Sequence, residues 1–79
     1  MVTILFVCTG NAARSQMAEG LLKNMKSEFL VLSAGTNPEE LHKNAVKVMA
    51  EIDLDISNQT SKSLTDVNWK DSDFAITLC

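Results

Sequence analysis

An almost unbroken apolar run from Val2 to Cys8 opens the sequence and constrains the fold more than any other feature. A strand with apolar side chains on both sides must be buried on both faces, which is typical of a parallel sheet covered by helices. Gly10 and Asn11 end the run, and both residue types tolerate the positive φ that a tight anion-binding loop needs. The pattern therefore predicts an α/β protein whose first strand leads into such a loop.

Helical and strand patterns alternate after this loop. Apolar residues at helical spacing predict a helix from about 14 to 26. Its apolar face is formed by Met17, Ala18, Leu21, Leu22 and Met25, and its polar face by Gln16, Glu19, Lys23 and Asn24. A second apolar run predicts a strand over 28–34. Strand, helix and strand then form one βαβ unit with a right-handed crossover.

The rest of the chain predicts a second helix and a third strand. Asn37 as a cap and Pro38 as a first helical residue mark a helix start, which lies between Pro38 and Lys43. Apolar spacing continues this helix to about Asp53. The elements that follow are a polar loop over 55–63, a short helical turn over 64–70 and a third buried strand over 73–79. Trp69 is expected to anchor that strand by packing.

Length and composition exclude several classes of protein. Seventy-nine residues form one domain at most, here 1–79. The net charge is −3 with both signs interspersed, which argues against a nucleic-acid or anionic-membrane partner. No apolar run approaches the roughly 18 residues that span a bilayer. Two cysteines without a secretory signal indicate the cytosol and reactive thiols, and with one histidine they are too few for a zinc site.

The segment from Cys8 to Ser15 carries the groups of an oxyanion site. Cys8 supplies a nucleophilic sulfur, and Arg14 supplies paired N–H donors that match a tetrahedral oxyanion. Between them lie Thr9, Gly10, Asn11, Ala12 and Ala13. Their backbone amides can converge on one point, where the following helix also places its positive end. We therefore expect phosphate or arsenate to bind this loop and to be attacked by Cys8.

The same loop, followed by Gln16–Gly20, resembles the motif of the low-molecular-weight protein tyrosine phosphatase superfamily, and most of all its thioredoxin-coupled arsenate reductases. The segments 33–36, 56–62 and 76–79 match that family in order and approximate spacing. The resemblance covers the whole chain but only the first part of a typical member. It implies a flavodoxin-like, three-layer fold with a parallel sheet in the order 2-1-3-4. This chain is expected to contain the first three of these strands and to stop before the fourth.

The resemblance also implies a role for each site residue. Cys8 is the nucleophile, Arg14 and the loop amides hold the oxyanion, Ser15 donates a hydrogen bond to Cys8, and Asn11 holds the loop in shape. Cys79 matches the second redox cysteine of the reductases. It would form a Cys8–Cys79 disulfide as arsenite leaves, and a thioredoxin-like dithiol would reduce that disulfide without a cofactor.

Two other functions remain open. The first is a phosphatase that works through a phosphocysteine, although no residue here matches the aspartate general acid of the phosphatases. The second is an inactive oxyanion-binding fragment that pairs with a second chain or dimerises, since three strands would leave an apolar sheet edge unpaired. Structural roles also remain open: Cys79 as a core residue, Asn11 as a turn residue and His42 as a helix-surface residue.

Three positions depart from the family pattern. Ala13 stands where many members have a further cysteine, and Gln16 stands where the phosphatases have proline, as in the reductase branch. Lys62 replaces an acidic residue with which some reductases bind potassium. No metal is therefore expected, and the Lys62 ammonium would take the place of the ion.

Overall fold

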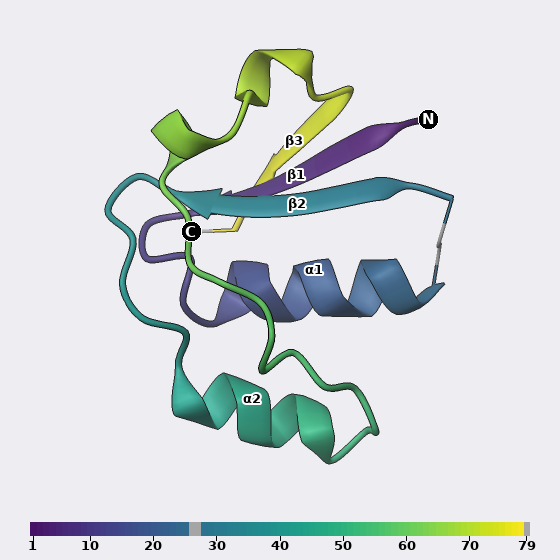
Figure 1. Cartoon of the computed structure of the whole chain (residues 1–79), viewed down its shortest axis with the longest axis vertical. Coiled ribbons are helices and arrows are strands. Elements are labelled where there is room, and N and C mark those ends of the chain that lie inside the picture. Colours follow the sequence, from purple (N-terminus) through teal and green to yellow (C-terminus); the bar gives the residue numbers. More distant parts are fainter. Residues whose placement is uncertain (26–27, 79) are drawn as a thin grey trace.

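Three parallel strands form the sheet of the computed structural model, which describes residues 1–25 and 28–78 (Figure 1). In chain order the elements are β1 (Thr3–Cys8), α1 (Arg14–Met25), β2 (Leu30–Gly35), α2 (Lys43–Ala50), the 3-10 turns η1 (Leu64–Asp66) and η2 (Trp69–Asp71), and β3 (Phe74–Thr77). The strand order is β2-β1-β3. This confirms the predicted α/β class and the predicted order as far as the third strand.

The register of the sheet brings its functional edge together. Cys8 at the end of β1 lies beside Gly35 at the end of β2, and Val7 lies beside Thr77 at the end of β3. Because all three strands are parallel, their carboxyl ends share one edge, which is where open α/β sheets bind ligands.

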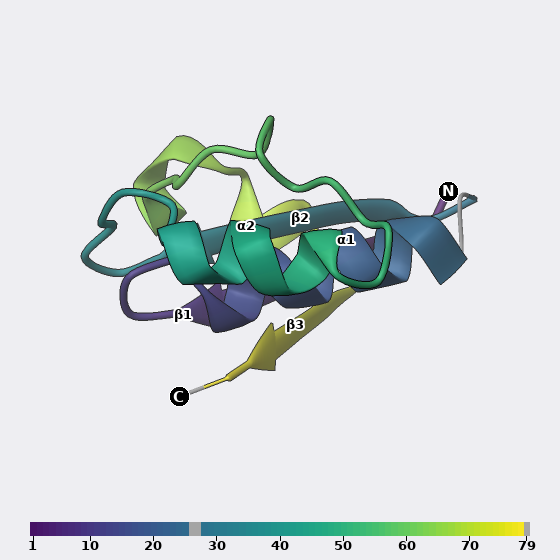
Figure 2. The same cartoon turned by 90° about the horizontal axis from the view of Figure 1, so that it is seen from below.

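The helices stack on one side of the sheet (Figures 1 and 2). α1 packs on β1 and β2, α2 packs on α1, and the two 3-10 turns lie on the other side of the strands. Two groups of buried side chains hold these layers. One group is Ile4, Phe6 and Val31 with Ala18 and Leu22, and the other is Ala45, Met49 and Ile56 with Ala13 and Met17.

The solvent-facing side of α1 differs from the prediction. Gln16 and Glu19 are buried, whereas Leu21 and Met25 are exposed. The reason is that a second segment covers the helix on the side away from the sheet. A Cβ on Gly20 would lie 2.5 Å from Cγ2 of Ile56, so this glycine allows the segment after α2, rather than the sheet, to pack closely.

The second helix begins at Lys43, at the late end of the predicted range. His42 is its N-cap and accepts a hydrogen bond from the Asn44 amide at its Nδ1, 3.1 Å away, so Asn37 is not the cap. The segment before it does not form a helix because its amides bond to the loop after β1, as described below. The helix also ends earlier than predicted, at Ala50, and Asp53 lies beyond it with a φ of 62°.

The third strand is exposed rather than buried. Phe74 and Ile76 are 59% and 41% exposed, because the helix next to the sheet, α1, packs on β1 and β2, and β3 lies at the edge beyond β1 (Figure 2). Trp69 is also exposed and contacts Lys70, whose Nζ lies 5.7 Å from the ring centroid, so it is not the predicted packing anchor. Cys79 lies outside the described residues.

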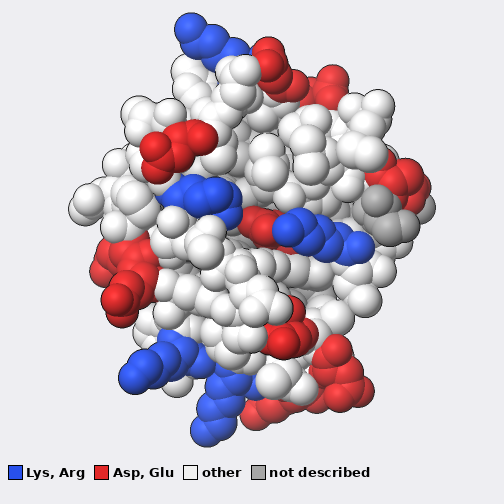
Figure 3. Space-filling view, in the orientation of Figure 1, with Lys and Arg blue, Asp and Glu red and all other residues white. Residues whose placement is uncertain are grey.

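The surface carries both signs of charge. Figure 3 shows Lys and Arg mixed with Asp and Glu on one face, with no extended patch of a single sign. Separately, none of the helices within the described ranges is long and apolar enough to cross a bilayer.

Candidate active site

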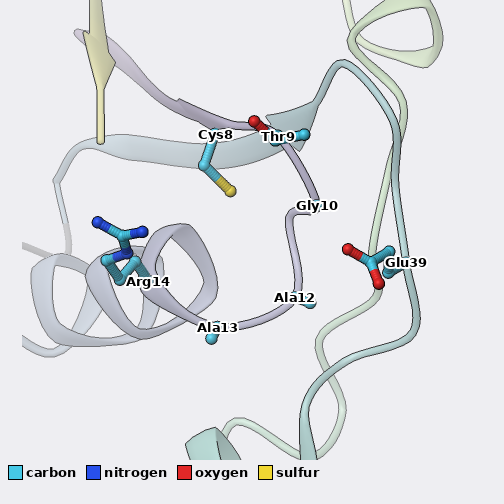
Figure 4. A pocket seen from close by; sticks show the side chains of 7 residues that line it. All are labelled: Cys8, Thr9, Gly10, Ala12, Ala13, Arg14 and Glu39. Carbon is cyan, nitrogen blue, oxygen red and sulfur yellow. The ribbon is translucent and has the colours of Figure 1, made fainter. Parts of the chain in front are cut away.

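A hollow of about 210 Å³ lies at the carboxyl edge of the sheet, between the end of β1 and the start of α1 (Figure 4). Its lining is Cys8, Thr9, Gly10, Ala12, Ala13, Arg14 and Glu39. The structure therefore brings most of the predicted site residues around one small space. Asn11 and Ser15 are fully buried behind it.

Hydrogen bonds to the outside of the loop fix the direction of its peptide groups. The carbonyls of Cys8, Thr9, Gly10 and Ala12 accept from the amides of Thr36, Asn37, Glu39 and His42, at 3.2, 2.9, 2.8 and 2.8 Å. Gly35 permits this close approach, since a Cβ there would lie 2.5 Å from the Thr9 carbonyl oxygen. With these carbonyls bonded outward, the loop is free to present N–H groups to the hollow.

Several backbone amides of the loop have no hydrogen-bond acceptor among the described residues. No described residue accepts a hydrogen bond from the amides of Gly10, Ala12, Ala13 or Arg14. Asn11 has a φ of 49°, the left-handed conformation that lets consecutive amides converge into an anion nest. Of the two residues that tolerate a positive φ in this loop, Asn11 adopts one and Gly10 does not. Gly10 instead provides space, because a Cβ there would lie 2.9 Å from Oε2 of Glu39.

Two groups contact the Cys8 sulfur from within the protein. The Asn11 amide donates to Sγ at 3.0 Å, and the Ser15 hydroxyl oxygen lies 2.8 Å from it. Both contacts are buried. A sulfur held in this way has a fixed direction, and Figure 4 shows it pointing from the end of β1 toward the loop.

Arg14 is the first residue of α1, and its side chain is exposed. Within the described ranges its guanidinium makes no hydrogen bond or ion pair. Figure 4 shows it rising from the helix start beside the hollow. Its N–H groups are thus available to an oxyanion, which would also meet the positive end of the α1 dipole.

Comparison with known sequences identifies the family. The sequence profile of the low molecular weight phosphotyrosine protein phosphatases matches residues 3–79. The chain belongs to this family. It is 48% identical over 77 residues to an arsenate reductase of Oceanobacillus iheyensis, and the match covers 96% of this chain and 55% of that protein. The chain therefore spans little more than half the length of this relative.

Solved structures of arsenate reductases agree with the fold. The chain superposes on an arsenate reductase in the phosphate binding state with a TM-score of 0.94 and 40% identity, covering 100% of this chain and 61% of that one. It also superposes on a thioredoxin-dependent arsenate reductase of Corynebacterium glutamicum, with a TM-score of 0.90 and 38% identity over 98% of this chain and 40% of that one.

Glu39 lines the hollow beside this loop, but the sequence pattern did not predict it as a site residue. The cap pattern placed it in the first turn of a helix, whereas its amide bonds to the Gly10 carbonyl and its side chain lies at the rim (Figure 4). A carboxylate at the rim of an anion site repels a bound dianion, so Glu39 opposes what Arg14 favours.

We expect Glu39→Gln to bind phosphate about two- to fivefold more tightly at low ionic strength, because a rim charge is worth about 0.4–1 kcal/mol, the upper part of the range for exposed ion pairs. Salt near 1 M should remove most of this difference by screening. Isothermal titration with phosphate measures both effects. Glu40→Gln is the matched control, since Glu40 does not line the hollow. Equal affinities for the Glu39 and Glu40 variants would contradict the repulsion.

A buried carboxylate lies behind the loop at Glu19. Its Oε2 accepts from Lys23 Nζ at 2.6 Å, and its Oε1 accepts from the Ser33 hydroxyl at 2.5 Å and lies 3.8 Å from Lys62 Nζ. The Lys62 ammonium thus lies next to a buried acidic group. Among the described residues, no three His, Cys, Asp or Glu side chains cluster as metal ligands would.

Asp55, in the loop after α2, has a carboxyl group whose pKa is lowered. The Ser57 hydroxyl and amide both donate to Asp55, at 2.6 and 2.8 Å, and hold the pKa of that carboxyl below its usual value. Asp55 does not line the hollow. This pair shapes the turn that delivers Ile56 to the core.

Proposed function

We propose that residues 1–79 form one domain that binds arsenate and carries out its reduction to arsenite in the cytosol. The observation that carries this proposal is the hollow itself. The Cys8 sulfur has a fixed direction there, next to loop amides and an Arg14 guanidinium that have no acceptor among residues 1–25 and 28–78. A relative that is 48% identical is named an arsenate reductase, which supports arsenate as the oxyanion.

The proposed chemistry begins at Cys8. Its thiolate forms a bond to arsenic while one arsenate oxygen leaves, with protons, as water. Arg14 and the amides of Gly10, Ala12 and Ala13 stabilise the charge on the remaining oxygens. Ser15 and the Asn11 amide hold the sulfur in the attacking direction.

Cys79 is proposed to complete the reduction. Its sulfur attacks the Cys8 sulfur, the S–As bond breaks, and the bonding pair stays on arsenic. Arsenic is thereby reduced from the pentavalent to the trivalent state while two thiols become one disulfide. The Leu78 amide donates to the Val7 carbonyl at 2.9 Å, so the residue before Cys79 in the sequence lies beside the end of β1, which supports this role. A thioredoxin-like dithiol would reduce the disulfide.

A single-turnover reaction tests this proposal. Reduced protein is mixed with arsenate, arsenite is quantified, and the thiols are mapped by mass spectrometry without reduction. We expect one arsenite per chain together with a Cys8–Cys79 disulfide, and neither product from Cys8→Ser. Cys79→Ser should hold the reaction before arsenite release. Free thiols on both cysteines of the parent after incubation would contradict the reductase.

Phosphate ester hydrolysis is the second candidate, because the family is that of phosphotyrosine phosphatases and phosphate has the same tetrahedral shape as arsenate. Incubation with an aryl phosphate distinguishes the two functions. A phosphorylated Cys8 with no disulfide formed by arsenate would favour the phosphatase.

Pairing with a second chain stays a prediction, and the surface that it concerns is the exposed β3 with Phe74 and Ile76. The mass of the protein in solution tests it.

A further inference from the structure

Gln16 is an amide with no exposed surface in the first turn of α1. The two N–H groups of its Nε2 are shared among three oxygens: the Asn11 carbonyl at 2.9 Å, Asn11 Oδ1 at 3.0 Å and the Thr60 carbonyl at 2.9 Å. Its Oε1 accepts from Gln59 Nε2 at 2.8 Å. Burying an amide is unfavourable unless it is bonded in this way. Gln16 therefore joins the catalytic loop to a segment more than 40 residues later.

The bonds around Asn11 decide the orientation of its side chain. The Lys62 amide lies 2.7 Å from the oxygen of that side chain, and a backbone amide can only donate. Gln16 donates to the same oxygen. The Asn11 nitrogen must then face Ser15, and it donates to the hydroxyl oxygen at 2.8 Å.

This orientation determines what Ser15 does to the nucleophile. The Ser15 oxygen already accepts from Asn11, and it lies 2.8 Å from Cys8 Sγ. A thiolate can only accept a hydrogen bond, so the Ser15 hydroxyl donates to it. Donation thus runs in one direction, from Gln16 to Asn11, from Asn11 to Ser15 and from Ser15 to Cys8.

We propose that Gln16 is a positioning residue for the nucleophile, which orients Asn11 so that Ser15 donates to the Cys8 thiolate. This proposal rests on the role of Cys8 in the proposed function. Gln16 touches neither the sulfur nor the hollow, and it acts through Asn11.

The network tolerates the removal of Gln16. Each of its three acceptors has a second donor: the Ser61 hydroxyl for the Asn11 carbonyl, the Lys62 amide for Asn11 Oδ1, and Lys62 Nζ for the Thr60 carbonyl. Gln16→Met fills a similar volume and leaves none of them unbonded. It removes the second contact that holds the Asn11 amide in place, so the Ser15 donation should weaken without loss of the fold.

The test is the pH dependence of Cys8 alkylation by iodoacetamide, in a Cys79→Ser background so that one thiol reacts. We expect the midpoint of the pH–rate profile to move up by roughly half a pH unit to one unit in Gln16→Met, the effect of about one weakened hydrogen bond. Ile56→Val is the control, because it loosens the core beside α1 without touching this network, and its midpoint should equal that of the parent.

A double-mutant cycle separates positioning from general destabilisation. If Gln16 acts through Ser15, Gln16→Met should not move the midpoint further once Ser15→Ala is present. Additive shifts, or an unchanged midpoint in Gln16→Met, would overturn the proposal. Should Gln16→Met fail to fold, Gln16→Leu replaces it, since it is also uncharged and cannot donate to Asn11. The readout needs no arsenate, so a failed arsenate reaction would contradict the proposed function alone.

Discussion

Arg14→Lys is expected to weaken phosphate binding about 10- to 100-fold although the positive charge is kept. Hydrogen bonds to charged groups contribute about 1.5–3 kcal/mol, and the planar guanidinium can make two parallel ones to a tetrahedral oxyanion. A lysine ammonium is a point charge on a flexible stem and cannot reproduce that fork. Arg14 is the first residue of α1, and no described residue competes for its N–H groups.

Isothermal titration with phosphate, at several ionic strengths, measures this loss. Lys70→Ala is the matched control: it removes a cation that lies over Trp69, and its affinity should stay near that of the parent. If Arg14→Lys bound phosphate as tightly as the parent, Arg14 would contribute only charge, and the amides of the loop would bind the anion without a bidentate partner.

The strand, loop and helix that carry Cys8 and Arg14 could be predicted from the sequence, because the residues that determine them are adjacent in the chain. The apolar run before Cys8, the loop and the amphipathic stretch after Arg14 predict a strand, a turn and a helix, and the structure contains them in that order. The positive φ at Asn11 follows from the same reasoning, since asparagine is one of the few residues that adopt it readily.

The non-local half could not be predicted, because distant segments compete for the same groups. Gln16 and Glu19 were assigned to solvent by helical spacing alone, yet Thr60 and Lys62 cover them and bond to them. A helix start at Asn37 was reasonable by its cap pattern, but the carbonyls of the loop after β1 accept from the amides that such a start would leave free. Periodicity does not contain this information.

Which strands a helix covers is a further property that an apolar run does not specify. The last strand resembles the first in composition, and burial was therefore predicted for both. α1 packs on β1 and β2, and the apolar runs of these strands are buried, whereas β3 lies beyond β1 and is exposed. Glu39 was missed for a related reason, since its place at the rim depends on a pairing between two loops.

Asn11→Ala is expected to lower the free energy of unfolding by about 2–4 kcal/mol, a large part of the stability of so small a domain. About 1–2 kcal/mol comes from the left-handed φ of 49°, which alanine adopts at a cost. The rest comes from the buried side-chain bonds with Ser15, Gln16 and the Lys62 amide. Urea unfolding, followed by circular dichroism, measures the change.

Comparison with Asn11→Gly separates the two contributions, because glycine removes the side chain but accepts the backbone conformation. We expect Asn11→Gly to be more stable than Asn11→Ala by about 1 kcal/mol and still less stable than the parent. Asp53 provides a matched pair, since its φ is 62° and its side chain is exposed. There the alanine and glycine variants should differ by the same amount, with the glycine variant close to the parent. If Asn11→Gly had the same free energy of unfolding as the parent, the bonds from Gln16 and Lys62 would add nothing to stability. The bonds around Asn11 would then act only on the direction of the Cys8 sulfur.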